Sequence, residues 1–159
     1  MITGFHRDFG LLTTHTPTRF DGMYAWLLTG EKVRVKIPEG HLLVQGGKQL
    51  EWMTGGYLKA GFHEVIHDKK VETQVKDNLR TGKSNWRVAC ALFSYVQGNL
   101  RLKPFPEFNK EGVEKLYPSV SADDYVKQEL KEDWTNVNIF FDLLQYLHSV
   151  GSIILSILR

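Results

Sequence analysis

The chain has 159 residues, of which 42% are hydrophobic and 12% aromatic, so it can bury one core, and these figures exclude a fully disordered protein. Its 20 Lys and Arg residues nearly balance 18 Asp and Glu residues, for a formal net charge of +2. Because the basic residues are scattered among acidic ones, the sequence predicts no nucleic-acid partner.

The compartment is predicted from the cysteine count and from the first residues. Cys90 is the single cysteine, so no intrachain disulfide can form and a reducing compartment is expected. Residues 1–10 contain no basic segment followed by an apolar run, and they therefore predict no secretory signal. We expect a cytoplasmic protein.

Residues 4–96 offer short runs of β-forming residues separated by Gly, Pro, Asp and Asn, without a long stretch of helical period. This pattern predicts an all-β sandwich or barrel. The expected strands are Leu11 to Thr16, Met23 to Leu28, Lys32 to Ile37, His41 to Val44, Lys59 to Ile66 and Arg87 to Val96.

The charged stretch between Ile66 and Trp86 is interpreted as a solvated loop, with a short helix as the alternative. Past Leu102 the sequence changes to helix and loop, and residues 121–124 read as a helix start before the run 125–131. We therefore expect a β core over 1–102, a helical appendage over 103–133 and an apolar helical tail over 134–159.

The apolar tail is interrupted by Asp142, and the run that follows it ends at Leu158. A bilayer span needs about 20 consecutive apolar residues. We therefore expect the tail to be a helix that packs on the core or on a partner rather than a membrane anchor.

Three residues carry the chemistry of a metal site. In His6-Arg7-Asp8 two ligand-type side chains are separated by one residue, and on an extended strand such positions project from the same face. His63 lies in an apolar strand-like run. Two histidines and one carboxylate on adjacent strands form a facial triad that leaves open positions on Fe(II), as expected for non-haem oxygenases.

Arg87 is a further candidate, because it begins an apolar predicted strand. A guanidinium is rarely buried without an anionic partner, and its planar fork suits a carboxylate. An ordinary ion pair at the strand edge is the alternative interpretation.

A rival motif overlaps His63. The residues 63–67 match H-E-x-x-H, the zinc signature in which two histidines one helical turn apart bind the metal. That motif requires a helix, whereas Val65 and Ile66 are β-branched and Gly61 precedes them. We therefore place a zinc peptidase behind the oxygenase.

Taken together, these residues resemble the iron(II)/2-oxoglutarate-dependent oxygenases, and within them the proteins similar to isopenicillin N synthase. The resemblance covers about residues 2–130. The segments that carry it are Gly4 to Thr13, Gly46 to Gly56, Lys59 to Val65, Trp86 to Ala89 and Tyr117 to Tyr125.

The resemblance implies a double-stranded β-helix, or jelly roll, with C-terminal helices. It also implies that His6, Asp8 and His63 bind Fe(II) and that Arg87 receives a carboxylate of 2-oxoglutarate. With O2 as the other cosubstrate, such an enzyme couples oxidative decarboxylation of 2-oxoglutarate to hydroxylation, desaturation or cyclisation of a small organic substrate.

Two departures from the family leave alternatives open. Ala89 stands where the family usually has serine, which puts the use of 2-oxoglutarate in doubt and leaves an oxidase like isopenicillin N synthase, which does without it, as an alternative. The chain also starts five residues before His6, so the N-terminal part of the jelly roll is expected to be missing. A truncated, inactive remnant is therefore the non-enzyme alternative.

Overall fold

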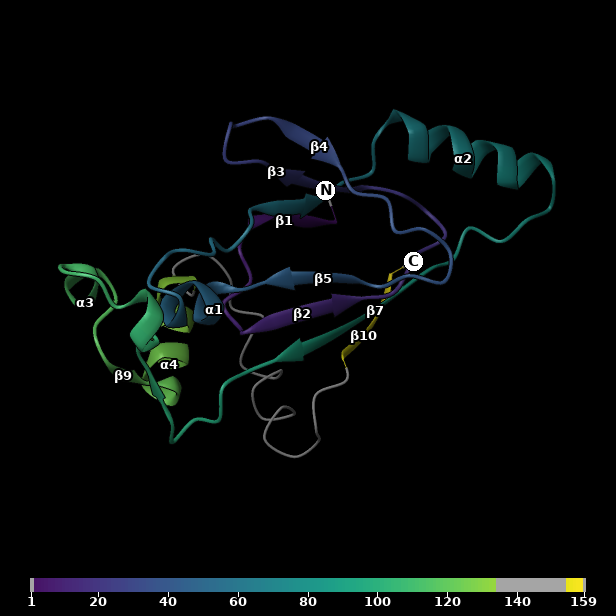
Figure 1. Ribbon diagram of the computed structural model, residues 1–159. Coiled ribbons are helices and arrows are strands. Elements are labelled where there is room, and N and C mark those ends of the chain that lie inside the picture. Colours follow the sequence, from purple (N-terminus) through teal and green to yellow (C-terminus); the bar gives the residue numbers. More distant parts are fainter. Residues whose placement is uncertain (1, 134–153, 159) are drawn as a thin grey trace.

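The computed structural model of the protein describes residues 2–133 and 154–158. In these ranges the chain forms two four-stranded sheets and one two-stranded sheet, and every pairing is antiparallel. Short helices lie at the ends of the sheets (Figure 1). The coarse prediction of a β core with helices after it is confirmed.

The first sheet carries the N-terminal strand. Its strands, in spatial order, are β1 (Thr3–His6), β6 (His63–Val65), β3 (Met23–Trp26) and β4 (Lys32–Arg34). The pairing of β1 with β6 places His6 opposite His63. Two residues that are far apart in the sequence thus become cross-strand neighbours.

The second sheet lies beside the first (Figure 1). Its strands, in spatial order, are β10 (Ile154–Leu158), β7 (Arg87–Ser94), β2 (Leu12–His15) and β5 (Leu43–Gly46). Residues of β2 and β7 that face the first sheet line a common cavity with residues of β1 and β6. The site described below lies in that cavity.

The helical elements flank these sheets. They are α1 (Lys48–Met53), α2 (Lys69–Arg80), the 3-10 helix η1 (Pro106–Phe108), α3 (Val113–Leu116) and α4 (Ala122–Asp133). The remaining strands β8 (Arg101–Leu102) and β9 (Val120–Ser121) pair with each other. A buried cluster of Leu102, Ala122 and Tyr125 joins this part to α1 through Trp52 and Met53.

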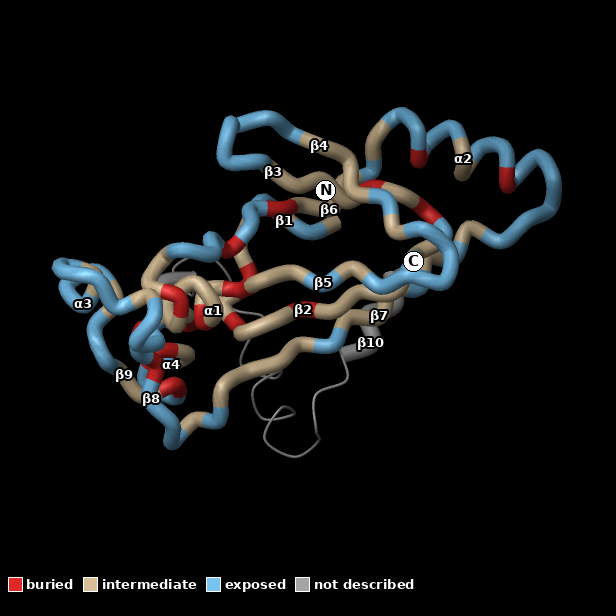
Figure 2. The backbone as a smooth tube through the Cα atoms, viewed as in Figure 1, coloured by how far each residue is buried: buried red, intermediate tan, exposed pale blue. Residues whose placement is uncertain are grey.

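Burial is concentrated where α1 and α4 meet the sheets, whereas α2 is exposed along most of its length (Figure 2). The glycines at the start and end of α1 explain its placement. Gly47 approaches the Gly10 carbonyl so closely that a Cβ there would lie 2.2 Å from its oxygen. Gly55 and Gly56 have φ values of 56° and 81°, a region that L side chains rarely adopt, so the chain can turn back after the helix.

Each of the six expected strands overlaps an observed one. The structure differs from the prediction in three other segments, which are α2, α1 and residues 154–158. The stretch interpreted as a loop contains the helix α2, whose first turn is capped by the Asp68 carboxylate accepting from the Val71 N–H. Helix α1 was not expected, because the breakers around it concealed six helical residues. Within the predicted helical tail, Ile154–Leu158 form a strand, and residues 134–153 and 159 lie outside the described residues.

None of the helices in the described part of the chain is long and apolar enough to cross a membrane.

Candidate metal centre

The candidate site is built at the ends of two paired strands. His6 is the last residue of β1 and His63 is the first residue of β6, and their ring centroids are 4.2 Å apart. Asp8 follows β1 by two residues and lies beyond the strand. The expectation that His6 and Asp8 share one strand face was therefore wrong, because the strand ends at His6.

The carboxylate of Asp8 nevertheless lies between the two imidazoles. Its Oδ1 is 3.4 Å from Nε2 of His6 and 3.8 Å from Nε2 of His63. Its Oδ2 accepts a hydrogen bond of 2.6 Å from the hydroxyl of Thr13, whose side chain is fully buried. One ligand atom from each of His6, Asp8 and His63 falls within 4.8 Å of the other two.

Both imidazoles have one nitrogen directed at a backbone carbonyl and the other at Asp8. Nδ1 of His6 lies 2.6 Å from the Gly4 carbonyl oxygen, and Nδ1 of His63 lies 3.4 Å from that of Gly61. This arrangement favours a proton on Nδ1 and leaves the Nε2 lone pairs directed at the site. Metal-binding histidines are commonly oriented in this way.

The environment favours the protonation states that bind metals. Burial opposes ionisation of Asp8, but its contacts with His6, Thr13 and His63 outweigh burial and hold the pKa of Asp8 below the ordinary value. Burial, and next the neighbouring His6, lower the pKa of His63. At neutral pH the site therefore offers a carboxylate and a neutral buried imidazole, which are the forms that coordinate a cation.

The second histidine of the rival zinc motif does not take part. His67 is exposed and lies beyond β6, which ends at Val65. His63 and Glu64 are in a strand, where the helical spacing that H-E-x-x-H requires does not exist. The geometry therefore removes the basis of the zinc peptidase interpretation.

The three residues border a cavity of about 190 Å³ that both sheets line. Arg87, Ala89 and Phe93 face it from β7. Within the described residues the Arg87 guanidinium has no hydrogen bond or ion pair, and burial lowers its pKa. An arginine without an anion at the wall of a cavity is suited to bind a carboxylate there.

Two residues of the site, Thr13 and His15, were not predicted from the sequence. Thr13 orients Asp8, but as a β-branched residue within the predicted strand Leu11 to Thr16 it resembled ordinary β packing. His15 also lines the cavity, its Nε2 lies 2.8 Å from the Gln45 amide nitrogen, and burial is the largest cause of its lowered pKa. The two residues have the i and i+2 spacing of one strand face, and this alternation was the signal that could have found them.

No family model matches the chain. It is 29% identical over 99 residues to 2-oxoglutarate-dependent dioxygenase 11 of Oryza sativa subsp. japonica, a match that covers 62% of this chain and 24% of the relative. It is 25% identical over 123 residues to scopoletin 8-hydroxylase of Arabidopsis thaliana, covering 77% of this chain and 30% of the relative.

Among solved structures, the fold resembles that of the dioxygenase for auxin oxidation in rice. The TM-score is 0.61 at 20% identity, and the match covers 82% of this chain and 40% of that chain. The chain is thus similar in sequence to curated 2-oxoglutarate-dependent oxygenases, which supports the predicted resemblance to that superfamily. It spans less than a third of the length of each curated relative, 2-oxoglutarate-dependent dioxygenase 11 and scopoletin 8-hydroxylase.

Proposed function

We propose that His6, Asp8 and His63 bind Fe(II) in a non-haem oxygenase that uses 2-oxoglutarate and O2 to oxidise a small organic substrate. The observation that carries this proposal is the convergence of the three ligand atoms within 4.8 Å at the wall of a shared cavity. Two imidazole nitrogens and one carboxylate oxygen are a donor set that suits Fe(II) and leaves coordination positions open. In the oxygenase superfamily that the chain resembles, such a ligand set holds the iron that reacts with O2.

In this proposal the protein's residues have separate tasks. Thr13 fixes the rotation of the Asp8 carboxylate, so that Oδ1 rather than Oδ2 points at the histidines. Arg87 holds the far carboxylate of 2-oxoglutarate by a bidentate grip, and the apolar residues Ala89 and Phe93 exclude water around it.

Bound Fe(II) would supply the redox chemistry in which O2 oxidatively decarboxylates 2-oxoglutarate to succinate and carbon dioxide, with one oxygen atom entering succinate and the other used to oxidise the substrate. We further infer that the two sheets are part of a jelly roll. An isopenicillin N synthase-like subgroup, a cytoplasmic location and a partner for residues 134–159 stay predictions.

The metal assignment is tested by anaerobic calorimetric titration of Fe(II) into the wild type, Asp8→Ala and His67→Ala. The wild type and His67→Ala should bind Fe(II) with equal affinity, and Asp8→Ala should lose tight binding because it removes the single anionic ligand. Equal binding by the wild type and Asp8→Ala would contradict the proposal. Loss of binding in His67→Ala would restore the zinc peptidase motif.

A further inference from the structure

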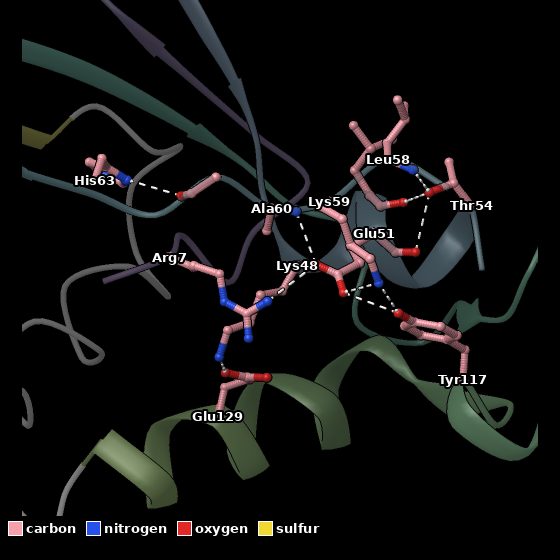
Figure 3. Close-up of polar contacts among 12 residues, drawn as sticks. Arg7, Lys48, Glu51, Thr54, Leu58, Lys59, Ala60, His63, Tyr117 and Glu129 are labelled. Atoms are coloured by element: carbon pink, nitrogen blue, oxygen red, sulfur yellow. Dashed lines mark hydrogen bonds and ion pairs between the residues drawn. The ribbon is translucent and has the colours of Figure 1, made fainter. Parts of the chain in front are cut away.

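Glu51 of α1 lies at the centre of a network of polar contacts (Figure 3). Its side chain is only 12% exposed. Oε2 accepts from the Ala60 N–H at 2.9 Å and lies 3.3 Å from Nη1 of Arg7. Oε1 accepts from the hydroxyl of Tyr117 at 3.1 Å and from Nζ of Lys59 at 3.3 Å.

Arg7, Lys59 and Ala60 belong to the two segments that carry the candidate ligands, whereas Tyr117 does not. Arg7 stands between His6 and Asp8, and Ala60 precedes His63 by three residues. A single carboxylate oxygen therefore contacts both segments. The Arg7 guanidinium also lies 4.8 Å from the centre of the Phe62 ring, which is next to His63, so the two segments meet a second time.

The helix that presents Glu51 is itself fixed to one of these segments. The Lys48 N–H donates to the Asp8 carbonyl at 2.8 Å, and the Gln49 N–H donates to the Gly10 carbonyl at 3.0 Å. Backbone bonds thus anchor α1 to the Asp8 side of the site. On the His63 side, the hydrogen bond from the Ala60 N–H to Glu51 provides the corresponding anchor.

The charges around Glu51 require its ionised form. Burial opposes ionisation, but the Ala60 N–H, the Tyr117 hydroxyl and the charge of Lys59 lower the pKa of Glu51 below its ordinary value. Loss of the negative charge would leave the cations of Arg7 and Lys59 without their shared partner. Charge-assisted hydrogen bonds of this kind are the stronger ones in a partly buried setting.

We propose that Glu51 is a positioning residue that sets the separation of the two ligand-bearing segments through Arg7 and Ala60. This inference rests on the proposed metal site. Because the ligand atoms come from separate segments, a small relative shift changes their spacing without unfolding the protein. Mutation of residues that orient the ligands of a metal commonly weakens metal binding by about ten- to a hundredfold.

The test compares Glu51→Gln with Arg7→Gln and with their double variant. Fe(II) affinity is measured by anaerobic calorimetry, and the visible absorption spectrum of the Co(II)-loaded protein reports ligand geometry. Each single variant should bind Fe(II) about tenfold more weakly than the wild type and give an altered Co(II) spectrum. The double variant should be little worse than either single one, because both remove the same contact.

Two controls separate positioning from general stability. Ser121→Ala removes the hydroxyl that accepts from the Asp124 N–H at the start of α4, a contact that involves neither Glu51 nor a ligand-bearing segment, so it should lower the urea midpoint and keep the wild-type Fe(II) affinity. Glu72→Gln removes the exposed ion pair with Lys76 on α2 and should change neither quantity. Folding of each variant is checked by its urea transition.

The outcomes distinguish this inference from the proposed function. Wild-type Fe(II) affinity and spectrum in folded Glu51→Gln and Arg7→Gln would overturn the positioning role alone. If Glu51→Gln does not fold, Arg7→Gln decides, since the Arg7 side chain is 30% exposed and tolerates substitution better. A wild type that binds neither Fe(II) nor Co(II) would overturn the metal site and this inference with it.

Discussion

The Asp8 carboxylate divides its two oxygens between different partners. Oδ2 accepts from the Thr13 hydroxyl, and Oδ1 faces His6 and His63. A carboxylate that is not held in this way can rotate and present either oxygen. The buried hydroxyl of Thr13 therefore matters for metal binding although it is too far along the chain to be read as part of the His6-Arg7-Asp8 motif.

Thr13→Val keeps the shape of the side chain and removes its hydroxyl. We expect Fe(II) affinity, measured by anaerobic calorimetry, to fall about tenfold because Asp8 loses the partner that orients it. Thr14→Val is the matched control, since Thr14 is the next residue of β2 and points to the opposite face. Equal losses in both variants would show that the hydroxyl of Thr13 has no special role.

Arg87→Ala should weaken the binding of 2-oxoglutarate to the Fe(II)-loaded protein by about 3 kcal/mol, because a bidentate charge-assisted contact is lost. Arg87→Lys should recover little of this, since one ammonium cannot reproduce the fork. Calorimetric titration of 2-oxoglutarate measures both. The control is Arg101→Ala, whose guanidinium is exposed and bonds to Ser119.

Ala89→Ser restores a hydroxyl on the strand that carries Arg87. We expect it to tighten 2-oxoglutarate binding by about 1 kcal/mol, the usual net value of one hydrogen bond. The same titration checks this, and Ser94→Ala at the far end of β7 is the comparison that should leave affinity unchanged. No gain in Ala89→Ser would indicate that the cosubstrate does not reach position 89.

At the level of elements, the start of α1 is packed against the Asp8 segment without room for a side chain. A Cβ on Gly47 would lie 2.2 Å from the Gly10 carbonyl oxygen and 2.9 Å from that of Asp8. Gly47→Ala should therefore destabilise the protein by about 2 kcal/mol in urea unfolding and weaken Fe(II) binding by moving Asp8. Gly61→Ala, where a Cβ meets nothing within 4 Å, should do neither.

Helix α2 is tied to the first sheet by Asp68. The Tyr24 hydroxyl, which donates to it at 2.5 Å, the Val71 N–H and the Arg34 guanidinium together lower the pKa of Asp68 well below its ordinary value, against the effect of burial. A group with a lowered pKa in the folded state stabilises the protein above its unfolded pKa, about 3.9 for Asp, and loses that contribution as pH falls below it.

Asp68→Asn keeps a capping oxygen but removes the charge. We expect the variant to be less stable than the wild type by about 1 kcal/mol at pH 7, and the difference to shrink as pH falls below about 4. Urea unfolding of both proteins between pH 7 and pH 3 measures this. A difference that does not depend on pH would show that the ion pair with Arg34 contributes nothing.

At the scale of the whole molecule, the sequence predicted the strands better than the helices. Short runs of β-forming residues between turn residues located β2, β3 and β7. Helix α1 was missed because its six residues stand between glycine pairs, and α2 because its charged sequence resembles a loop. Tertiary contacts, not local preference, determine both.

The sequence likewise predicted only some residues of the candidate site. Residue type and spacing were enough to single out His6, Asp8, His63 and Arg87. They could not reveal that Thr13 orients Asp8 or that Glu51 contacts both ligand-bearing segments, since those relationships join residues that are distant in the sequence or in different elements, and only the fold brings them together. Nothing in the local sequence around Glu51 differs from ordinary helix packing.

We propose that the metal and Arg87 together form the binding site for 2-oxoglutarate. The most direct test of this claim is anaerobic calorimetric titration of 2-oxoglutarate into the Fe(II)-loaded wild type, the metal-free wild type and Asp8→Ala. We predict saturable binding to the loaded wild type, and much weaker binding to the other two because they lack the metal. If the loaded wild type binds no 2-oxoglutarate, or binds it equally well without Fe(II), the claim is contradicted.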